Sequence, residues 1–107
     1  MLAEWSDIIE KLRLVDSIVD FARGYMQLSV ILTALDEERI IPDYVADRLK
    51  LSRKSVIDAI QKLKKKGLLY KGEGNVYILT EKGKKFLKIL HEIMLVLSNA
   101  LRRFMII

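Results

Sequence analysis

Cysteine is absent from this sequence of 107 residues, and proline and histidine occur once each. The absence of cysteine excludes disulfides, thiolate metal sites and cysteine nucleophiles, and it is typical of a cytoplasmic protein. The single histidine, His91, has only Glu92 nearby in the sequence as a second metal-ligating residue type, so we expect no metal site. No pair of catalytic residue types stands at a working spacing, and no cofactor fingerprint occurs. We therefore expect neither an enzyme nor a bound cofactor.

Side-chain amides are also scarce, with two asparagines and two glutamines against many Ile, Leu, Lys and Glu residues, a composition that hints at a hot environment. Long apolar runs are missing too. The most apolar stretch is broken by Lys88, Glu92, Arg102 and Arg103 well below the roughly 20 residues that a membrane span requires. A helix lying in the membrane interface is an alternative, but the stretch lacks a dense cationic face. We expect no membrane partner.

The charges are distributed unevenly along the chain, although their sum is only +5. Residues 1–47 carry four basic and ten acidic side chains, hence −6; residues 48–88 carry thirteen and three, hence +10; residues 89–107 carry two and one, hence +1. Such a field attracts a polyanion to the basic segment and keeps the acidic segment away from it. A lysine run alone is often only a solvated helix end. The whole basic block, however, coincides with the helix pattern described next, and it predicts a nucleic-acid partner.

The stretch from 41 to 69 has the pattern of two short amphipathic helices joined by a tight turn. The first helix is predicted to begin at Pro42, whose fixed φ suits a first turn, with Asp43 favouring the positive end of the helix dipole. Leu51 is predicted to fill the turn, and Ser52 to cap the second helix. An apolar stripe faces inward, made of Val45, Ala46, Leu49, Val56, Ile60 and Leu63. The other face of the second helix is polar and predicts DNA binding, with Arg53, Lys54, Gln61, Lys62 and Lys65.

The segments on either side predict one more short helix and a β-hairpin. Residues 25–35 form a helix pattern whose inward face is Leu28, Ile31, Leu32 and Leu35. Residues 39–41 are long enough only for a loop or a minimal strand. After Gly67, which suits a left-handed helix cap, residues 68–71 and 76–80 are β-prone and flank a turn with two glycines. They predict a hairpin that leans on the helices, because a lone hairpin is marginal in water.

Two longer helices are predicted at the ends, over residues 1–23 with a stop at Gly24, and from Glu81, capped by Thr80, toward the C-terminus. Their apolar residues alternate by three and four positions, the spacing of helices that pair as coiled coils. Because each helix carries more apolar surface than a small domain can cover, we expect a homodimer built on them. A single wide core-facing stripe on the first helix is the alternative. The predicted dimer contacts are Trp5, Leu12, Val15, Val19, Leu90, Ile93, Met94, Leu97, Leu101 and Phe104.

The order of three helices, a hairpin with a glycine tip and a long helix resembles that of winged helix-turn-helix proteins. Two strings carry the resemblance: YVADRL through SRKSVIDAIQKLKKKGLL, and VYILTEKGKKFL. In layout the chain resembles the dimeric MarR-type and compact ArsR-type regulators, whose terminal helices form the dimer. The resemblance implies a mainly α fold with a small β-hairpin, as one winged helix-turn-helix domain over residues 1–107. Its parts are an N-terminal dimerisation helix (1–23), a winged-helix core (24–80) and a C-terminal dimerisation helix (81–107).

The resemblance also implies a sequence-specific, double-stranded DNA-binding transcriptional regulator, with helix 52–66 in the major groove and wing 71–76 on the backbone or minor groove. A non-specific or architectural DNA-binding protein and a winged-helix module that binds protein are the alternatives. Asp58 accepts from a cytosine amino group or pairs with a basic side chain, Ile57 contacts a thymine methyl or turns inward, and Lys50 replaces the usual glycine of the turn. No residue specifies a small-molecule effector. The implied DNA contacts are Ser52, Arg53, Lys54, Ser55, Ile57, Asp58, Gln61, Lys62 and Lys65 on the helix, and Lys71 and Asn75 on the wing.

Overall fold

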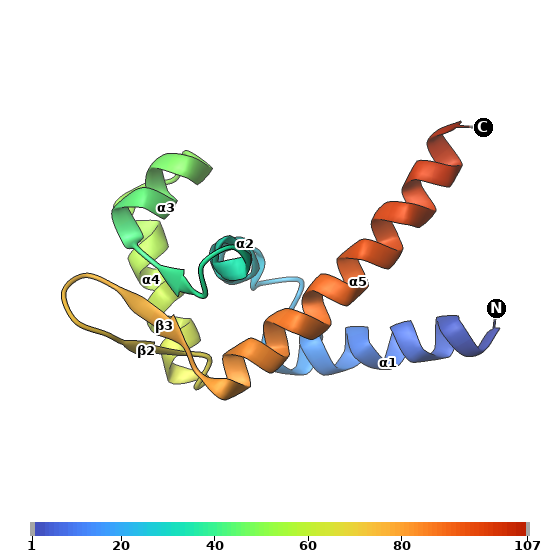
Figure 1. Ribbon diagram of the computed structural model, residues 1–107, viewed down its shortest axis with the longest axis horizontal. Coiled ribbons are helices and arrows are strands. Elements are labelled where there is room, and N and C mark those ends of the chain that lie inside the picture. Colours follow the sequence, from blue (N-terminus) through green and yellow to red (C-terminus); the bar gives the residue numbers. More distant parts are fainter. Residues whose placement is uncertain (1, 107) are drawn as a thin grey trace.

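A computed structural model describes residues 2–106 of the chain, with side chains for residues 5–103. It confirms a mainly helical fold with a small antiparallel sheet (Figure 1). The elements follow in the order α1 (Leu2–Ile18), α2 (Tyr25–Leu32), the 3-10 helix η1 (Thr33–Leu35), β1 (Arg39–Ile40), α3 (Pro42–Leu49), α4 (Arg53–Lys65), β2 (Leu69–Lys71), β3 (Tyr77–Leu79) and α5 (Glu81–Ile106).

Helices α3 and α4 form the predicted helix-turn-helix, and local capping fixes both ends of each helix. Pro42 opens α3, and the Ser52 side chain caps α4 by accepting from the Ser55 amide at 3.1 Å, as predicted. Lys50 ends α3 in the left-handed conformation, with φ 57°, a role that glycine usually fills. Gly67, with φ 78°, follows the end of α4 in the same way, and it confirms the predicted left-handed cap.

The inner face of the helix-turn-helix packs on α2, which lies against α4. The predicted stripe is confirmed at Val45, Ala46, Val56, Ile60 and Leu63, all of which are buried; Leu49 is half-buried against the same core. Burying a large aliphatic side chain contributes roughly 1.5–3 kcal/mol. This packing therefore fixes the orientation of α4, so that its opposite face is exposed to solvent.

The face predicted for α2 is confirmed at Ile31, which is buried, and at Leu28 and Leu32, which are half-buried against the core, and it is wrong only at Leu35. Val30, Ile31 and Ala34 are fully buried, whereas Leu35, predicted to point inward, is 42% exposed. Leu35 lies in the 3-10 helix η1, which replaces the α-helix from Thr33 onward. A 3-10 helix has about three residues per turn instead of 3.6, so the residues after Thr33 advance further around the axis than the sequence pattern assumes.

The predicted hairpin is confirmed as β2 and β3, which form the wing, and it has a third partner. Strand β1 pairs with β3, so the sheet order is β1-β3-β2 with both pairs antiparallel. Residues 39–41 therefore contribute the minimal strand that the sequence allows. The turn closes with Gly74 at φ 70°, and the Gly72 amide donates to the Val76 carbonyl at 2.9 Å. In Figure 1 the tip of this hairpin projects away from α1 and α5.

Helix α1 ends at Ile18, so the prediction that it runs to Arg23 is wrong. Two aspartate side chains replace the helical acceptors in this segment. The amide of Phe21 donates to Asp16 Oδ1 at 2.9 Å, and the amide of Ala22 donates to Asp20 Oδ1 at 2.8 Å. Short acidic side chains compete for backbone amides in this manner and favour turns over helix. The chain then turns back into α2.

Helix α5 begins as predicted, with Thr80 Oγ1 accepting from the Gly83 amide at 2.9 Å, and it packs on α1. The ammonium of Lys11 on α1 joins the two helices through Glu92 on α5 at 3.1 Å. Beyond this crossing the helices diverge toward their free ends (Figure 1). None of the helices within residues 2–106 is long and apolar enough to cross a membrane.

Four side chains that the sequence assigns to a dimer interface lie in the core of the single chain, namely Val15, Val19, Leu90 and Ile93. The assignment is corrected for these four, because α1 and α5 of the same chain cover them. Leu12 is half-buried against the same core. Trp5, Met94, Leu97 and Leu101 are exposed, whereas the Phe104 side chain lies outside the described residues. The dimer itself stays a prediction, and it now depends on the exposed members.

Candidate nucleic-acid interface

The N-terminus of α4 is exposed, and two hydrogen bonds between Ser52 and Ser55 stabilise its first turn. Besides capping the Ser55 amide, the Ser52 hydroxyl donates to the Ser55 hydroxyl at 2.8 Å. Arg53 and Lys54, the first two residues of the helix, are exposed. Free backbone amides and the positive end of the helix dipole favour an anion at such a position. Two cationic side chains at the same end reinforce that preference.

Along α4, the side chains opposite the buried stripe form one exposed row. Lys54, Asp58, Lys62 and Lys65 recur at spacings of four, four and three, so they share a face of the helix. No ion pair within 4.0 Å joins Asp58 to a basic group among residues 5–103. Ile57 is half-buried, so it turns partly inward, and Ser55 is half-buried as well. The row is therefore cationic with one carboxylate in its middle.

Two side chains predicted to read bases are already hydrogen-bonded within the chain. Arg53 Nε donates to Asp43 Oδ1 of α3 at 2.6 Å. Gln61 Nε2 donates to the hydroxyl of Tyr77 on β3 at 3.4 Å, which links α4 to the wing. Asp43 belongs to the site, although the sequence indicated only a favourable charge at the start of α3. The sequence contained one indication of this contact, because Asp43 and Arg53 have opposite charges and each lies in the first turn of its helix.

The wing carries the other predicted contacts. Lys71, Glu73 and Asn75 are exposed around the hairpin turn, and Lys71 stands opposite Tyr77 in the strand register. Figure 1 places the turn at the same end of the molecule as α3 and α4. The exposed row of α4 and the wing therefore lie at one end of the fold, and the free ends of α1 and α5 lie at the other.

The end of α4 is tied to the rest of the fold by two lysines. Lys66 Nζ donates to Gln27 Oε1, and Gln27 is a buried polar residue on α2. Burial lowers the pKa of Lys66, and the charge of neighbouring Lys62 acts in the same direction. Lys82 Nζ donates to the Lys66 carbonyl at 2.9 Å, which neutralises part of the negative end of the helix dipole. These two lysines have structural partners, so they are not counted in the exposed row.

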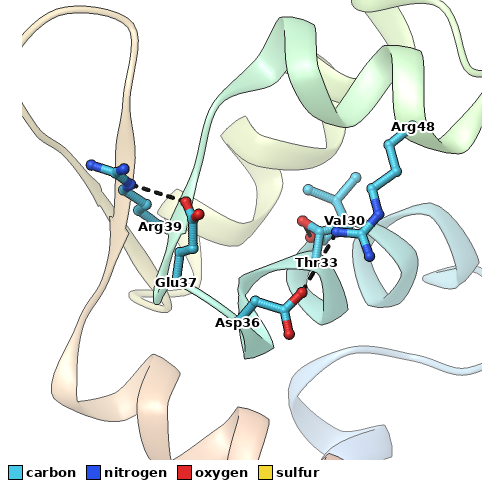
Figure 2. A network of polar contacts seen from close by, with 6 residues as sticks. All are labelled: Val30, Thr33, Asp36, Glu37, Arg39 and Arg48. Atoms are coloured by element: carbon cyan, nitrogen blue, oxygen red, sulfur yellow. Dashed lines mark hydrogen bonds and ion pairs between the residues drawn. The ribbon is translucent and has the colours of Figure 1, made fainter.

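A second group of charges lies around η1, β1 and α3 (Figure 2). Arg48 pairs with Asp36 at 3.7 Å, and Arg39 with Glu37 at 3.3 Å, beside a cavity of about 60 Å³. Nearby, Glu38 and Glu81 raise the pKa of Lys84. The acidic residues Asp36, Glu37 and Glu38 therefore compensate basic groups that lie away from α4, whereas Asp43 pairs with Arg53 at the start of α4. On the exposed row of α4, Lys54, Lys62 and Lys65 form no ion pair within 4.0 Å among residues 5–103, and the same holds for Lys71 on the wing.

Among residues 5–103 no group of three or more metal-ligating side chains comes together. Besides the carboxylates Asp43 and Asp58, the candidate interface consists of cationic, amide and hydroxyl groups, the types that hydrogen-bond to phosphates and to base edges.

This chain is similar in sequence and in architecture to known proteins, although no protein-family model matches it. Two related proteins come from Sulfolobus acidocaldarius. The HTH-type transcriptional activator ArnR1 is 37% identical over 87 residues, which is 81% of this chain and 32% of the relative. The HTH-type transcriptional activator ArnR is 33% identical over 78 residues, which is 73% of this chain and 29% of the relative. This chain therefore spans about a third of the length of the curated relatives it matches.

Solved structures show the same architecture. A MarR transcriptional regulator from Methanosarcina mazei superposes with a TM-score of 0.59 at 26% identity, covering 94% of this chain and 84% of its own. Sco5413, a MarR family transcriptional regulator from Streptomyces coelicolor, superposes with a TM-score of 0.58 at 20% identity, covering 95% and 79%. The matched part includes most of the terminal helices as well as the wing, because so little of the chain is left out. This chain is a winged helix-turn-helix protein with the fold of the MarR-type transcriptional regulators.

Proposed function

We propose that this chain is the DNA-binding part of a sequence-specific transcription regulator, not an enzyme, and that α4 enters the major groove of double-stranded DNA. The observation that carries the proposal is the exposed row on α4. The opposite, apolar face of α4 is buried in the core, so the helix presents Lys54 and Lys62 of the row to solvent, with Arg53 at its start. A helix held from behind in this way fits the major groove, which is about 12 Å wide.

The distribution of charge supports the same orientation. The wing cation Lys71 is exposed at the end of the fold where α4 lies. The acidic residues between η1 and β1, namely Asp36, Glu37 and Glu38, are paired with Arg48, Arg39 and Lys84, respectively. Lysines near phosphates release condensed counterions, so binding should weaken steeply as the salt concentration rises. The wing then lies over the flanking backbone or minor groove.

The regulator is proposed to act as a homodimer, and the exposed apolar surface of the diverging helices supports this. Trp5 on α1 is 46% exposed, and Leu97 and Leu101 on α5 are 40% and 62% exposed. A groove of about 560 Å³ between the two helices is lined by apolar side chains, among them Trp5, Leu95 and Val96, and by charged ones, namely Asp7, Lys11, Glu92 and Arg103. Several large apolar side chains exposed on the same two helices favour an interaction site there. A two-fold axis through these helices requires a pseudopalindromic site with half-sites about one helical turn, roughly 10 base pairs, apart.

One observation favours a second candidate, a protein that coats DNA without reading its sequence. Arg53 and Gln61, which offer the most specific hydrogen-bonding groups of α4, are engaged by Asp43 and Tyr77. The groups left unengaged are mostly lysines, which bind phosphate without regard to sequence.

Selection of bound duplexes from a random DNA pool distinguishes these candidates. The proposed regulator should enrich a pseudopalindrome and bind it about 10³-fold or more tightly than random DNA at fixed salt. A coating protein should bind strongly but enrich nothing. Absence of DNA binding at physiological salt would contradict both and favour a protein-binding winged helix.

A further inference from the structure

The ion pair between Asp43 and Arg53 joins the starts of the two helices of the helix-turn-helix. Asp43 lies in the first turn of α3, Arg53 is the first residue of α4, and Arg53 Nε donates to Asp43 Oδ1 at 2.6 Å. The two side chains are 67% and 61% exposed, respectively. Exposed pairs contribute little to folding stability. The main consequence of this contact is therefore the direction in which the guanidinium group points.

The chemistry of the guanidinium group makes that direction important. An arginine has five N–H donors in a rigid plane, one on Nε and four on the two Nη atoms. It can grip a pair of acceptors through Nε and one Nη, or through both Nη atoms. Because Asp43 occupies Nε, only the pair of Nη atoms is left for an external partner. The N7 and O6 acceptors of guanine in the major groove are the partner that arginine most often grips in this bidentate manner.

We propose that Asp43 is a positioning residue for base recognition, which fixes the Arg53 guanidinium so that both Nη atoms face one guanine of each half-site. This inference rests on the proposed function, because it requires α4 to lie in the major groove. A carboxylate near the phosphate backbone repels DNA, so Asp43 lowers the affinity for every sequence. Its benefit is discrimination, since an Arg53 side chain without a fixed direction can also bind phosphates and other bases.

Asp47 offers a matched control on the same helix. It lies one turn after Asp43, it is exposed, and no ion pair within 4.0 Å involves it among residues 5–103. Asp47→Ala and Asp43→Ala remove the same charge, but only Asp43→Ala frees Arg53. A general electrostatic effect should appear in both variants, whereas an effect on the direction of Arg53 should appear in one.

The test compares the affinities of the unmodified protein, Asp43→Ala, Asp47→Ala, Arg53→Ala and the double variant Asp43→Ala/Arg53→Ala at fixed salt. The probes are the duplex selected from the random pool, a random duplex, and the selected duplex with each guanine replaced in turn. Asp43→Ala should raise affinity for random DNA and lower the selected-to-random ratio by about 2- to 10-fold, the net value of one orienting hydrogen bond. The ratio should fall because preference is lost at one guanine of each half-site. Asp47→Ala should leave the ratio unchanged.

In the Arg53→Ala background, Asp43→Ala should no longer change the ratio. Asp43→Asn, which keeps an acceptor oxygen for Nε, should retain part of the preference. An unchanged ratio in Asp43→Ala, or an equal change with and without Arg53, would overturn the positioning role. A higher ratio would also overturn it, because Asp43 would then restrain Arg53 from reading DNA. If the unmodified protein prefers no sequence, the proposed function itself fails; if it does and only the coupling to Arg53 is missing, this inference alone fails.

Discussion

The substitution Leu97→Glu tests the proposed dimer at a side chain that the single chain leaves 40% exposed. Leu97 lies on α5 about one turn after the buried residue Ile93. In the proposed dimer its exposed part is covered by the second copy. A glutamate there would place two carboxylates, one from each chain, in an apolar interface without a partner.

The exposed fraction sets the expected loss. Full burial of a leucine contributes about 2 kcal/mol, so covering the remaining 40% contributes about 0.8 kcal/mol per chain. Burying an unpaired carboxylate costs several kcal/mol, and we take ~3 kcal/mol for each chain. Both effects occur twice in a two-fold dimer. Since ~1.4 kcal/mol corresponds to a factor of ten, dimerisation should weaken by at least about 1,000-fold even if the carboxylates partly reach solvent.

Sedimentation equilibrium at micromolar concentration measures this change directly. Ser98→Glu is the matched control, because it adds the same charge to the next, exposed position of α5, about 100° further around the helix. The unmodified protein and Ser98→Glu should be dimers, and Leu97→Glu should be a folded monomer with an unchanged helical circular dichroism spectrum per residue. A monomeric unmodified protein, or a Leu97→Glu variant that stays dimeric, would refute the reasoning.

Three further predictions concern the stability of the fold, and urea unfolding checks each of them. Ser52→Ala should lower the free energy of unfolding by about 1 kcal/mol, because the Ser55 amide loses its cap; an unchanged value would mean that water replaces the hydroxyl. Gly83→Ala should cost about 3 kcal/mol or more, since a Cβ atom would lie 2.0 Å from the Leu68 carbonyl oxygen; a small loss would show that α5 shifts easily. Burial lowers the pKa of Lys66 below its ordinary value of 10.5, so the unfolded chain binds more protons, and stability should rise as the pH increases toward 10.5. The Lys66→Gln variant should lack that part of the rise, and identical pH profiles would contradict the assigned cause.

Residues at the helix ends were predicted correctly, because the hydrogen bonds and backbone conformations there depend on residues close in the sequence. Pro42, Ser52, Gly67 and Thr80 each satisfy or remove a backbone group at a helix end, and all four hold the predicted positions. The buried stripe of α4 followed from its spacing alone. These features depend on residues within a few positions of one another, so a single sequence contains the information they require.

Other features depend on competition between distant or equivalent partners. The sequence could not show that Asp16 and Asp20 would take backbone amides and end α1 at Ile18, because the same residues also fit a helix. Coiled-coil spacing predicts that a helix has a partner, but not whether the partner belongs to the same chain. For Val15 and Ile93 the partner is internal.

The residues proposed to contact DNA were predicted as a surface, and most of them are exposed in the structure. Their internal hydrogen bonds could not be predicted from spacing. Arg53 and Asp43 meet only because the turn between α3 and α4 sets the angle of the two helices. Gln61 meets Tyr77 only because the wing folds back on α4. Whether these side chains contact bases stays a prediction.

The most direct measurement of the central claim, that α4 reads DNA sequence, compares Arg53→Ala with Lys62→Ala on the selected duplex and on random DNA at several salt concentrations. Lys62→Ala should weaken binding to both duplexes alike and reduce the salt slope by roughly one unit per site. Arg53→Ala should cost about 1–3 kcal/mol on the selected duplex and less on random DNA. Equal losses on the two duplexes for Arg53→Ala would contradict the claim, because α4 would then be an electrostatic anchor.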